Sequence, residues 1–206
     1  MKPLEKTAAS AHLHRASGVI LSILWALFAI AHFNGFHLTG RTSLLMFGLA
    51  ETAIGVFFLL RTQPKSCTTR PHEWVTALAG TFLPLFLRPT TDTPIAIADW
   101  CLVLGSTVQI VGVLSLNRSF ALVPALRELK THGMYRFVRH PIYFSYLINY
   151  TSYLTANFSA ENLLIILGSI GFLVARVFFE ERHLSQTPEY RAYQDRVRWR
   201  LLPYVF

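Results

Sequence analysis

Charged residues are scarce in this chain, and their scarcity excludes an ordinary soluble fold. Only 15% of the 206 residues are Asp, Glu, Lys or Arg, while 52% are hydrophobic. Soluble domains usually carry about 25% charged residues, and a soluble domain of this length has too little interior to hide so much apolar surface. The composition therefore indicates a protein whose surface lies largely in a lipid bilayer.

Cysteine is also scarce, and neither internal repeats nor low-complexity tracts occur. The two cysteines, Cys67 and Cys101, form no disulfide framework and no metal-ligand spacing. His12 and His14 form one close pair and His32 and His37 another, but neither pair has a carboxylate or cysteine nearby that could complete a metal site. We therefore expect no metal site. The first apolar run starts after Gly18 and is longer than the apolar part of a cleavable signal peptide. We interpret it as a retained first helix.

The long apolar runs predict an all-α fold, a polytopic transmembrane helical bundle. About 20 apolar residues cross the roughly 30 Å hydrocarbon core as a helix. The run at residues 74–87 contains Pro84, which neighbouring helices can accommodate. The run at residues 141–156 is short for a full span. The last two runs predict a C-terminal helical hairpin. We predict about five to six spans, over residues 18–38, 42–60, 74–87, 100–116, 141–156 and 162–179.

The positive charges predict the orientation of these spans. With a cytoplasmic N-terminus, 16 of the 19 Lys and Arg residues fall in cytoplasmic segments, and only Arg41 and Arg88 lie outside. This is a strong positive-inside bias. We therefore expect both termini in the cytoplasm, in a bacterial or archaeal plasma membrane. Basic segments between apolar runs suit anionic lipid headgroups, so we expect membrane lipids and no nucleic acid as partners. The sequence does not define an oligomeric state.

Polar residues concentrate after residue 116, and one stretch among them predicts a ligand site. Residues 133–143 read G-M-Y-R-F-V-R-H-P-I-Y. Gly133 permits a tight turn, the proline pushes His140 out of helical conformation, and Pro141 suits a first helical position. The free N–H groups at that helix start favour an anion such as a carboxylate. A basic anchor followed by an ordinary helix would show the same pattern.

Arg176 lies deep in the last apolar run, with Glu180 four residues later on the same helical face. A charge near a helix centre costs about 2.5–3.5 kcal/mol on insertion scales, so such residues usually face protein or a cavity. The two side chains either pair with each other, with Arg176 snorkelling to the interface, or each binds a charged group of a ligand.

The C-terminal tail carries a second amphipathic pattern. Tyr190, Tyr193 and Val197 occupy one face of a helix whose other faces hold arginines. This pattern is typical of an interfacial helix. A lid over a site beneath it is the alternative.

At these residues the chain resembles the isoprenylcysteine carboxyl methyltransferase family and its phospholipid-methyltransferase relatives. The resemblance covers roughly residues 117–206. It rests on G-x-Y-x-x-x-R-H-P-x-Y, then R-x-x-x-E-E-x-x-L, then a Y-x-x-Y and R-V…L-P tail. One such motif would be weak evidence for the resemblance. All of them together, in this order and near the C-terminus of a multispan protein, are specific evidence for it.

The resemblance implies S-adenosyl-L-methionine as the cofactor, bound in a cytoplasmic pocket between the loop, the last hairpin and the tail. It implies that Arg176 orients the substrate. Where the family has a glutamine upstream of the loop, this chain has Phe120. The cofactor contacts implied by the resemblance are Arg127, Glu128, Leu129, Lys130, Tyr135, His140, Pro141, Ile142, Tyr143 and Glu180.

We therefore divide the chain into N-terminal transmembrane helices, residues 1–116, which form the membrane anchor and substrate tunnel, and a catalytic region, residues 117–206. The expected function is methyl transfer to a lipophilic small molecule or lipidated substrate, with the carboxylate of a prenylcysteine-like acceptor as the first choice. Alternatives are a phospholipid or amine N-methyltransferase, an NADPH-dependent sterol-reductase-like membrane protein, and a small transporter or membrane scaffold.

Overall fold

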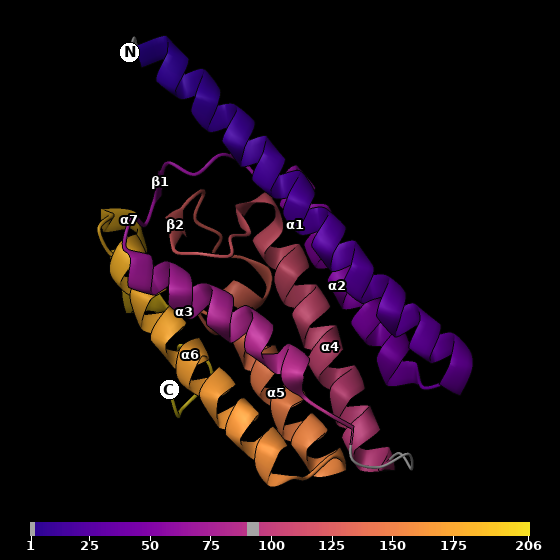
Figure 1. Cartoon of the computed structure of the whole chain (residues 1–206). Helices are drawn as coiled ribbons and strands as arrows, with labels where there is room; N and C mark the ends of the chain where they lie inside the picture. Colours follow the sequence, from indigo (N-terminus) through magenta and orange to yellow (C-terminus); the bar gives the residue numbers. More distant parts are fainter. Residues whose placement is uncertain (1–2, 90–94) are drawn as a thin grey trace.

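The computed structural model describes residues 3–89 and 95–206, with side chains from His12 onward. Within these ranges the chain forms seven α-helices, three short 3-10 helices and one pair of two-residue strands (Figure 1). The α-helices are α1 Pro3–Thr39, α2 Thr42–Leu60, α3 Pro71–Phe82, α4 Ala96–Leu116, α5 Pro141–Ala156, α6 Ala160–Leu184 and α7 Pro188–Arg196. The shorter elements are η1 Leu83–Phe86, η2 Asn117–Ser119, η3 Gly133–Arg136, β1 Ser66–Cys67 and β2 Ala125–Leu126.

Four helical segments are long and apolar enough to cross a membrane: His12–Thr39, Thr42–Leu60, Ala96–Ser119 and Ala160–Leu184. The prediction of an all-α, multi-pass membrane protein is confirmed. The predicted number of five to six spans is larger than these four, because two of the predicted segments form shorter helices.

The two shorter segments differ from the others for separate reasons. α3 has 12 residues and gives way to η1 at Leu83, next to Pro84, because the proline ring cannot continue an α-helix without distortion. α5 has 16 residues, which at 1.5 Å per residue spans about 24 Å. Both still pack beside long helices, α3 against α6 and α5 against α4.

The helices form one continuous series of neighbours in the bundle. α1 packs against α2, α2 against α4, α4 against α5, α5 against α6, and α6 against α3. Figure 1 shows α1 and α2 on one side and α3 and α6 on the other. Gly112 on α4 lets α5 approach closely, since a Cβ there would lie 3.0 Å from Ile142. Small residues serve this purpose in membrane helix packing.

The main apolar core joins α1, α2 and α4 to the start of α5. Its centre is aromatic: the Trp25 and Phe58 ring centroids lie 4.9 Å apart, and Phe58 meets Phe120 edge-on at 5.1 Å. Large apolar side chains such as Ile20, Leu104 and Leu164 point outward and are 65%, 56% and 70% exposed. Apolar surface of this kind on several helices fits a lipid environment.

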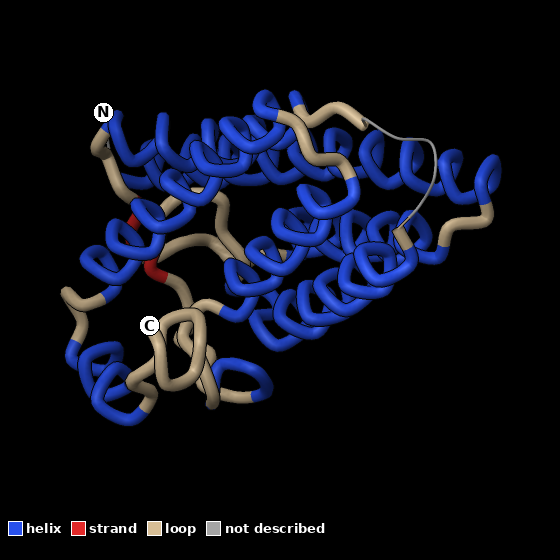
Figure 2. The backbone as a smooth tube through the Cα atoms, turned by 90° about the horizontal axis from the view of Figure 1, so that it is seen from below, coloured by secondary structure: helices blue, strands red, loops and turns tan. Residues whose placement is uncertain are grey.

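One end of the bundle carries nearly all the non-helical structure. β1 and β2 pair antiparallel with Cys67 opposite Ala125, and the Lys65 N–H donates to the Leu126 carbonyl at 2.7 Å. Figures 1 and 2 show these strands, α7 and the C-terminal loop gathered at the same end as the N-terminus. This is the end that the charge bias predicts to be cytoplasmic.

Candidate active site

A cavity with an empty space of about 920 Å³, including its open mouth, lies at this end of the bundle. It is bounded by the end of α4, the segment 119–130, the start of α5, the last turns of α6, and α7. Its aromatic and charged lining residues are Phe120, Arg127, Glu128, Lys130, Tyr135, Arg139, His140, Tyr143, Tyr146, Arg176, Glu180, Tyr190 and Tyr193.

The structure brings the predicted site residues together around this one cavity. The exception is Pro141, which is buried and supports the helix start without lining the cavity. The roles assigned to these residues as ligand contacts remain predictions. Those that line the cavity are Arg127, Glu128, Leu129, Lys130, Tyr135, His140, Ile142, Tyr143, Arg176 and Glu180.

A tight turn at Gly133 places Tyr135 in the cavity wall. Gly133 has a φ of +59°, and a Cβ at this position would overlap the Ser115 side chain on α4. Only glycine fits both the left-handed backbone and the close approach. Burial, and then the negative charge of Glu180, raises the pKa of Tyr135 well above its ordinary value, so its hydroxyl stays protonated at neutral pH.

The start of α5 has the geometry that the His-Pro pair predicts. His140 is the N-cap, with a non-helical φ of −130° and ψ of 63°, and Pro141 is in the first turn. The N–H groups of Arg139 and His140 donate to the carbonyls of Trp199 and Arg200, at 2.9 and 2.8 Å. The tail therefore runs along this segment and fixes where α5 begins.

A buried ionic cluster, which the sequence did not predict, reinforces this contact. Glu181 accepts from Arg139 at 2.7 Å, from His140 Nε2 at 3.2 Å and from Arg200 at 2.9 Å. Arg139 also donates to the carbonyls of Val197 and Arg198. We call Glu181, Arg139, His140 and Arg200 the tail clamp. The doubled glutamate and the Arg-His pair were the only sequence signals for it.

Arg176 and Glu180 face the cavity but do not pair with each other. Arg176 donates to Thr81 Oγ1 on α3 at 3.1 Å and to the Leu122 carbonyl at 3.0 Å, and its guanidinium lies 5.1 Å from the Tyr143 ring centroid. Glu180 accepts from the Tyr143 hydroxyl at 2.9 Å. Arg176 is only 8% exposed, so it does not snorkel to the membrane surface.

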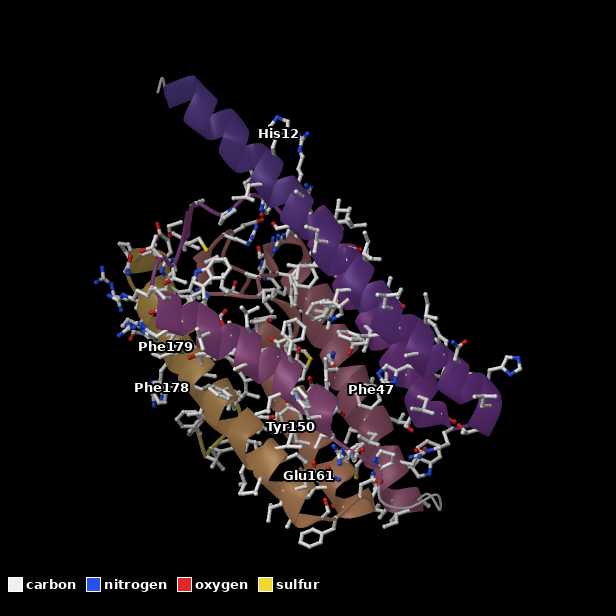
Figure 3. The ribbon with its side chains drawn as sticks, in the orientation of Figure 1. His12, Phe47, Tyr150, Glu161, Phe178 and Phe179 are labelled. Carbon is white, nitrogen blue, oxygen red and sulfur yellow. The ribbon has the colours of Figure 1, made fainter. Side chains whose placement is uncertain are left out.

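A row of aromatic rings leads from the cavity into the bundle. The ring centroids of His140 and Tyr143 lie 5.4 Å apart, those of Tyr143 and Tyr146 6.2 Å, and those of Tyr146 and Tyr150 6.4 Å. Tyr150 lies well along the helices from the end of the bundle that carries the N-terminus (Figure 3). This row gives one wall of the cavity an aromatic surface that extends toward the membrane interior.

The sequence left two alternatives for the tail, an interfacial helix or a lid over a site. In the structure α7 has the position of a lid. Its buried face, Tyr190 and Tyr193 followed by Val197, packs on Leu129 and Leu184, and the Tyr193 hydroxyl donates to the Tyr135 carbonyl at 2.6 Å. Both tyrosines line the cavity. The apolar face is thus used inside the protein and is not free to enter a membrane surface.

Phe120 introduces an apolar ring where the family pattern has an amide. It is 7% exposed and lines the cavity between Phe58 and the segment 125–130. In the part of the chain that the structure describes, no group of three or more His, Cys, Asp or Glu side chains is arranged to hold a metal ion. The cavity lining is aromatic and carries charges of both signs.

Residues 94–191 match the model of the phospholipid methyltransferase family. No curated protein matches the chain. The matched segment contains α4, the loop, the α5–α6 hairpin and the first residues of α7, and so it supplies almost every side chain that lines the cavity. Over this segment, just under half of the chain, the protein is therefore similar to the phospholipid methyltransferase family of membrane methyltransferases, whose members use S-adenosylmethionine.

Proposed function

We propose that this protein transfers the methyl group of S-adenosylmethionine to a lipid-like acceptor, most directly the carboxylate of a prenylcysteine-like substrate. The observation that carries the proposal is the single cavity in which Arg176, Glu180 and the rings of Tyr135 and Tyr143 meet. Its mixed aromatic and charged lining fits a ligand with an adenine, an ammonium and a sulfonium.

The residues for the cofactor are on the cytoplasmic side of the cavity. The Glu180 carboxylate accepts one hydrogen bond, from Tyr143, and its other oxygen is placed to accept from an ammonium. The rings of Tyr135, Tyr143 and Tyr190 offer faces for adenine and for a sulfonium. When bound, S-adenosylmethionine supplies an electrophilic methyl group.

The residues for the acceptor lie deeper, along α6 and α5. Arg176 holds a positive charge at the inner end of the cavity, where it would orient an anionic acceptor whose lipid tail enters between the helices. A carboxylate acceptor has no proton to lose, so alignment and exclusion of water are the protein's main tasks. We infer that residues 1–116 supply the membrane anchor and the tunnel wall.

Methylation of a phospholipid headgroup or another amine is the second candidate, and the family match favours it directly. In that reaction Arg176 would contact the headgroup phosphate. An NADPH-dependent reductase is the third candidate. In each case we place the cavity mouth in the cytoplasm.

Two measurements on the purified protein test the proposal. Calorimetry should show binding of S-adenosylhomocysteine and none of NADPH. Transfer of radiolabelled methyl to N-acetyl-S-farnesylcysteine should give a product that releases methanol in alkali, because carboxyl methyl esters hydrolyse there. With phosphatidylethanolamine as acceptor, the label would stay on nitrogen and survive alkali.

Binding of NADPH with no binding of S-adenosylhomocysteine would overturn the methyltransferase assignment. Alkali-stable label on the aminophospholipid, with none on the farnesylcysteine, would replace the first acceptor class by the second. The exposed residue Arg191 on α7 provides a matched control as Arg191→Gln, because no described contact uses its side chain.

A further inference from the structure

Arg127 is a buried cation without an anionic partner. Its side chain lines the cavity, and the residue is only 7% exposed. Its Nε and Nη1 atoms are buried and have no hydrogen-bond partner among the described residues. Burying an unpaired charge is costly, since neither water nor a counter-ion compensates it. Within the described part of the chain, the Nε and Nη1 atoms of Arg127 therefore keep hydrogen-bonding capacity that no protein group uses.

A second arginine lies close behind it. Arg61, just after α2, donates from Nη2 to Ser17 Oγ at 2.8 Å and lies over the Phe58 ring at 5.3 Å, while its Nε is buried without a partner. Burial, and then the charge of Arg61, lowers the pKa of Arg127 to about 10. The two cations thus repel each other, and their proximity adds to the cost.

The β1–β2 pairing is what brings the two arginines together. The Lys65 N–H donates to the Leu126 carbonyl, one residue before Arg127, and the Thr62 N–H donates to the Arg118 carbonyl at 3.0 Å. These bonds tie the segment after α2 to the segment after α4. Arg61 lies outside the family match at 94–191, so this pairing joins the matched segment to the part of the chain that precedes it.

Among the described residues, neither acidic side chain that lines the cavity forms an ion pair with Arg127. Glu128 pairs with Lys130 at 2.8 Å and is largely exposed, and Glu180 accepts from Tyr143. The other titratable groups near the arginines are His14 and Cys67, and burial raises the pKa of the Cys67 thiol. Neither supplies a negative charge at neutral pH.

We propose that Arg127, supported by Arg61, forms an oxyanion subsite in the cavity wall. The ligand is a carboxylate or a phosphate, which the planar guanidinium binds through two parallel hydrogen bonds. Two sources offer this chemistry: the carboxylate of the methyl donor and the phosphate of a lipid headgroup. The inference rests on the proposed function, since it concerns ligands of the same cavity.

The experiment measures ligand affinities of Arg127→Gln, Arg127→Lys and Arg61→Gln, with Arg191→Gln as the control. The first pair of probes is S-adenosylhomocysteine and S-adenosyl-3-thiopropylamine, which keeps the ammonium and lacks the carboxylate. The second pair is dihexanoylphosphatidylcholine and dihexanoylglycerol, which differ in the phosphate headgroup. Isothermal calorimetry and the thermal shift caused by each probe give readouts that do not depend on turnover.

Arg127→Gln should weaken the oxyanion member of one pair about tenfold or more and leave the other member unchanged. Arg127→Lys should lose part of that affinity, because lysine keeps the charge but lacks the planar guanidinium that donates two parallel hydrogen bonds. If affinity falls for S-adenosylhomocysteine, the ligand of Arg127 is the carboxylate of the methyl donor. If it falls for dihexanoylphosphatidylcholine, the ligand is the lipid phosphate. Without ligand, Arg127→Gln should melt no lower than the wild type, because an uncompensated charge is removed.

Equal affinity of Arg127→Gln and the wild type for both oxyanion probes would overturn the inference. So would an equal loss for both members of a pair, accompanied by a lower melting temperature, since that pattern describes a purely structural arginine. A wild type that fails to bind S-adenosylhomocysteine would instead contradict the proposed function, so the two failures are distinguishable.

Discussion

Glu180 and Glu181 are adjacent residues of α6 whose surroundings differ completely. Glu181 is 5% exposed and is surrounded by Arg139, His140 and Arg200 in the tail clamp. Glu180 faces the cavity and accepts one hydrogen bond, from Tyr143. Successive positions on a helix point about 100° apart. One carboxylate is therefore committed to structure, and the other is available to a ligand.

The first prediction at this scale concerns Glu180→Gln. It should weaken S-adenosylhomocysteine binding by about ten- to hundredfold, because hydrogen bonds to charged groups contribute about 1.5–3 kcal/mol. Calorimetry measures this directly. The melting temperature of the free protein should stay close to that of the wild type, and undiminished affinity would remove Glu180 from the site.

Arg176 carries the second residue-scale prediction. Arg176→Ala should lower turnover at subsaturating acceptor by about ten- to hundredfold, since a charge-assisted contact contributes about 1.5–3 kcal/mol, and should leave S-adenosylhomocysteine affinity nearly intact. Arg176→Lys, which keeps the charge, should retain more activity. Turnover of Arg176→Ala equal to that of the wild type would defeat the orienting role.

At the scale of elements, the tail is held to the hairpin mainly through one buried carboxylate. Besides the clamp, Leu201 packs on Leu173 and Val177, and Arg200 lies over the rings of Phe178 and Phe206 at 5.3 and 5.0 Å. Figure 3 shows Phe178 on the side of α6 that faces the C-terminus. The tail in turn fixes α7 over the cavity.

Glu181→Ala should release this tail. Removing one partner of a buried ion pair costs about 3–5 kcal/mol, since the remaining charges lose their compensation. Limited trypsin digestion should then cut after Arg196, Arg198 or Arg200 much faster than in the wild type. Glu180→Gln is the control, because Glu180 is outside the clamp, and equal cleavage rates in Glu181→Ala and Glu180→Gln would contradict this account.

A second ion pair joins the start of α3 to the end of α6. Arg182 donates to Glu73 at 2.7 Å, and the ring of Phe179 meets His72 edge-on at 5.4 Å. Burial of the Glu73 carboxyl opposes its ionisation, but its interaction with Thr68, its hydrogen bond with Arg182 and the charges of Arg182 and Arg70 hold its pKa below the ordinary value of 4.5.

This shift predicts a pH dependence of stability. A depressed folded-state pKa contributes stability above the unfolded value, and that contribution disappears as pH falls through the folded value. At neutral pH the wild type should therefore melt higher than Glu73→Gln. The difference should shrink as pH falls from about 7 to about 3. Thermal melts across that range measure it, and a constant difference would exclude Glu73 as the source.

At the scale of the whole molecule, the charges and the architecture agree on a single orientation. The β1–β2 pair, α7 and the N-terminus share one end of the bundle (Figure 1), and the cavity lined by residues of α7 and of the segment that contains β2 lies there too. Figure 3 places His12 at that end and Glu161 at the opposite one. Most Lys and Arg residues belong to the segments at the first end, as the positive-inside rule expects of a cytoplasmic face.

Cysteine labelling tests this orientation. In a background with Cys67→Ala and Cys101→Ala, a membrane-impermeant maleimide added to intact spheroplasts should label Phe158→Cys and not Gln186→Cys. Both positions are exposed, at opposite ends of α6. Labelling of both should appear after the membrane is permeabilised. The reverse pattern on intact cells would invert the topology.

The sequence by itself determined the features that depend on local chemistry. The apolar runs predicted α2 and α5 with the bounds that the structure has, because hydrocarbon leaves the backbone little choice but a helix. Gly133 and the His140-Pro141 pair predicted the turn and the start of α5, since both are constraints on single residues. The motif order identified the segment that lines the cavity.

Only the tertiary structure decided which charges found partners. Nothing local to Glu181 predicts that Arg139 and Arg200 reach it, and nothing local to Arg127 predicts that it has no partner while Arg61 lies nearby. These outcomes depend on contacts between segments far apart in the chain, and the energy of a charge depends on everything that surrounds it.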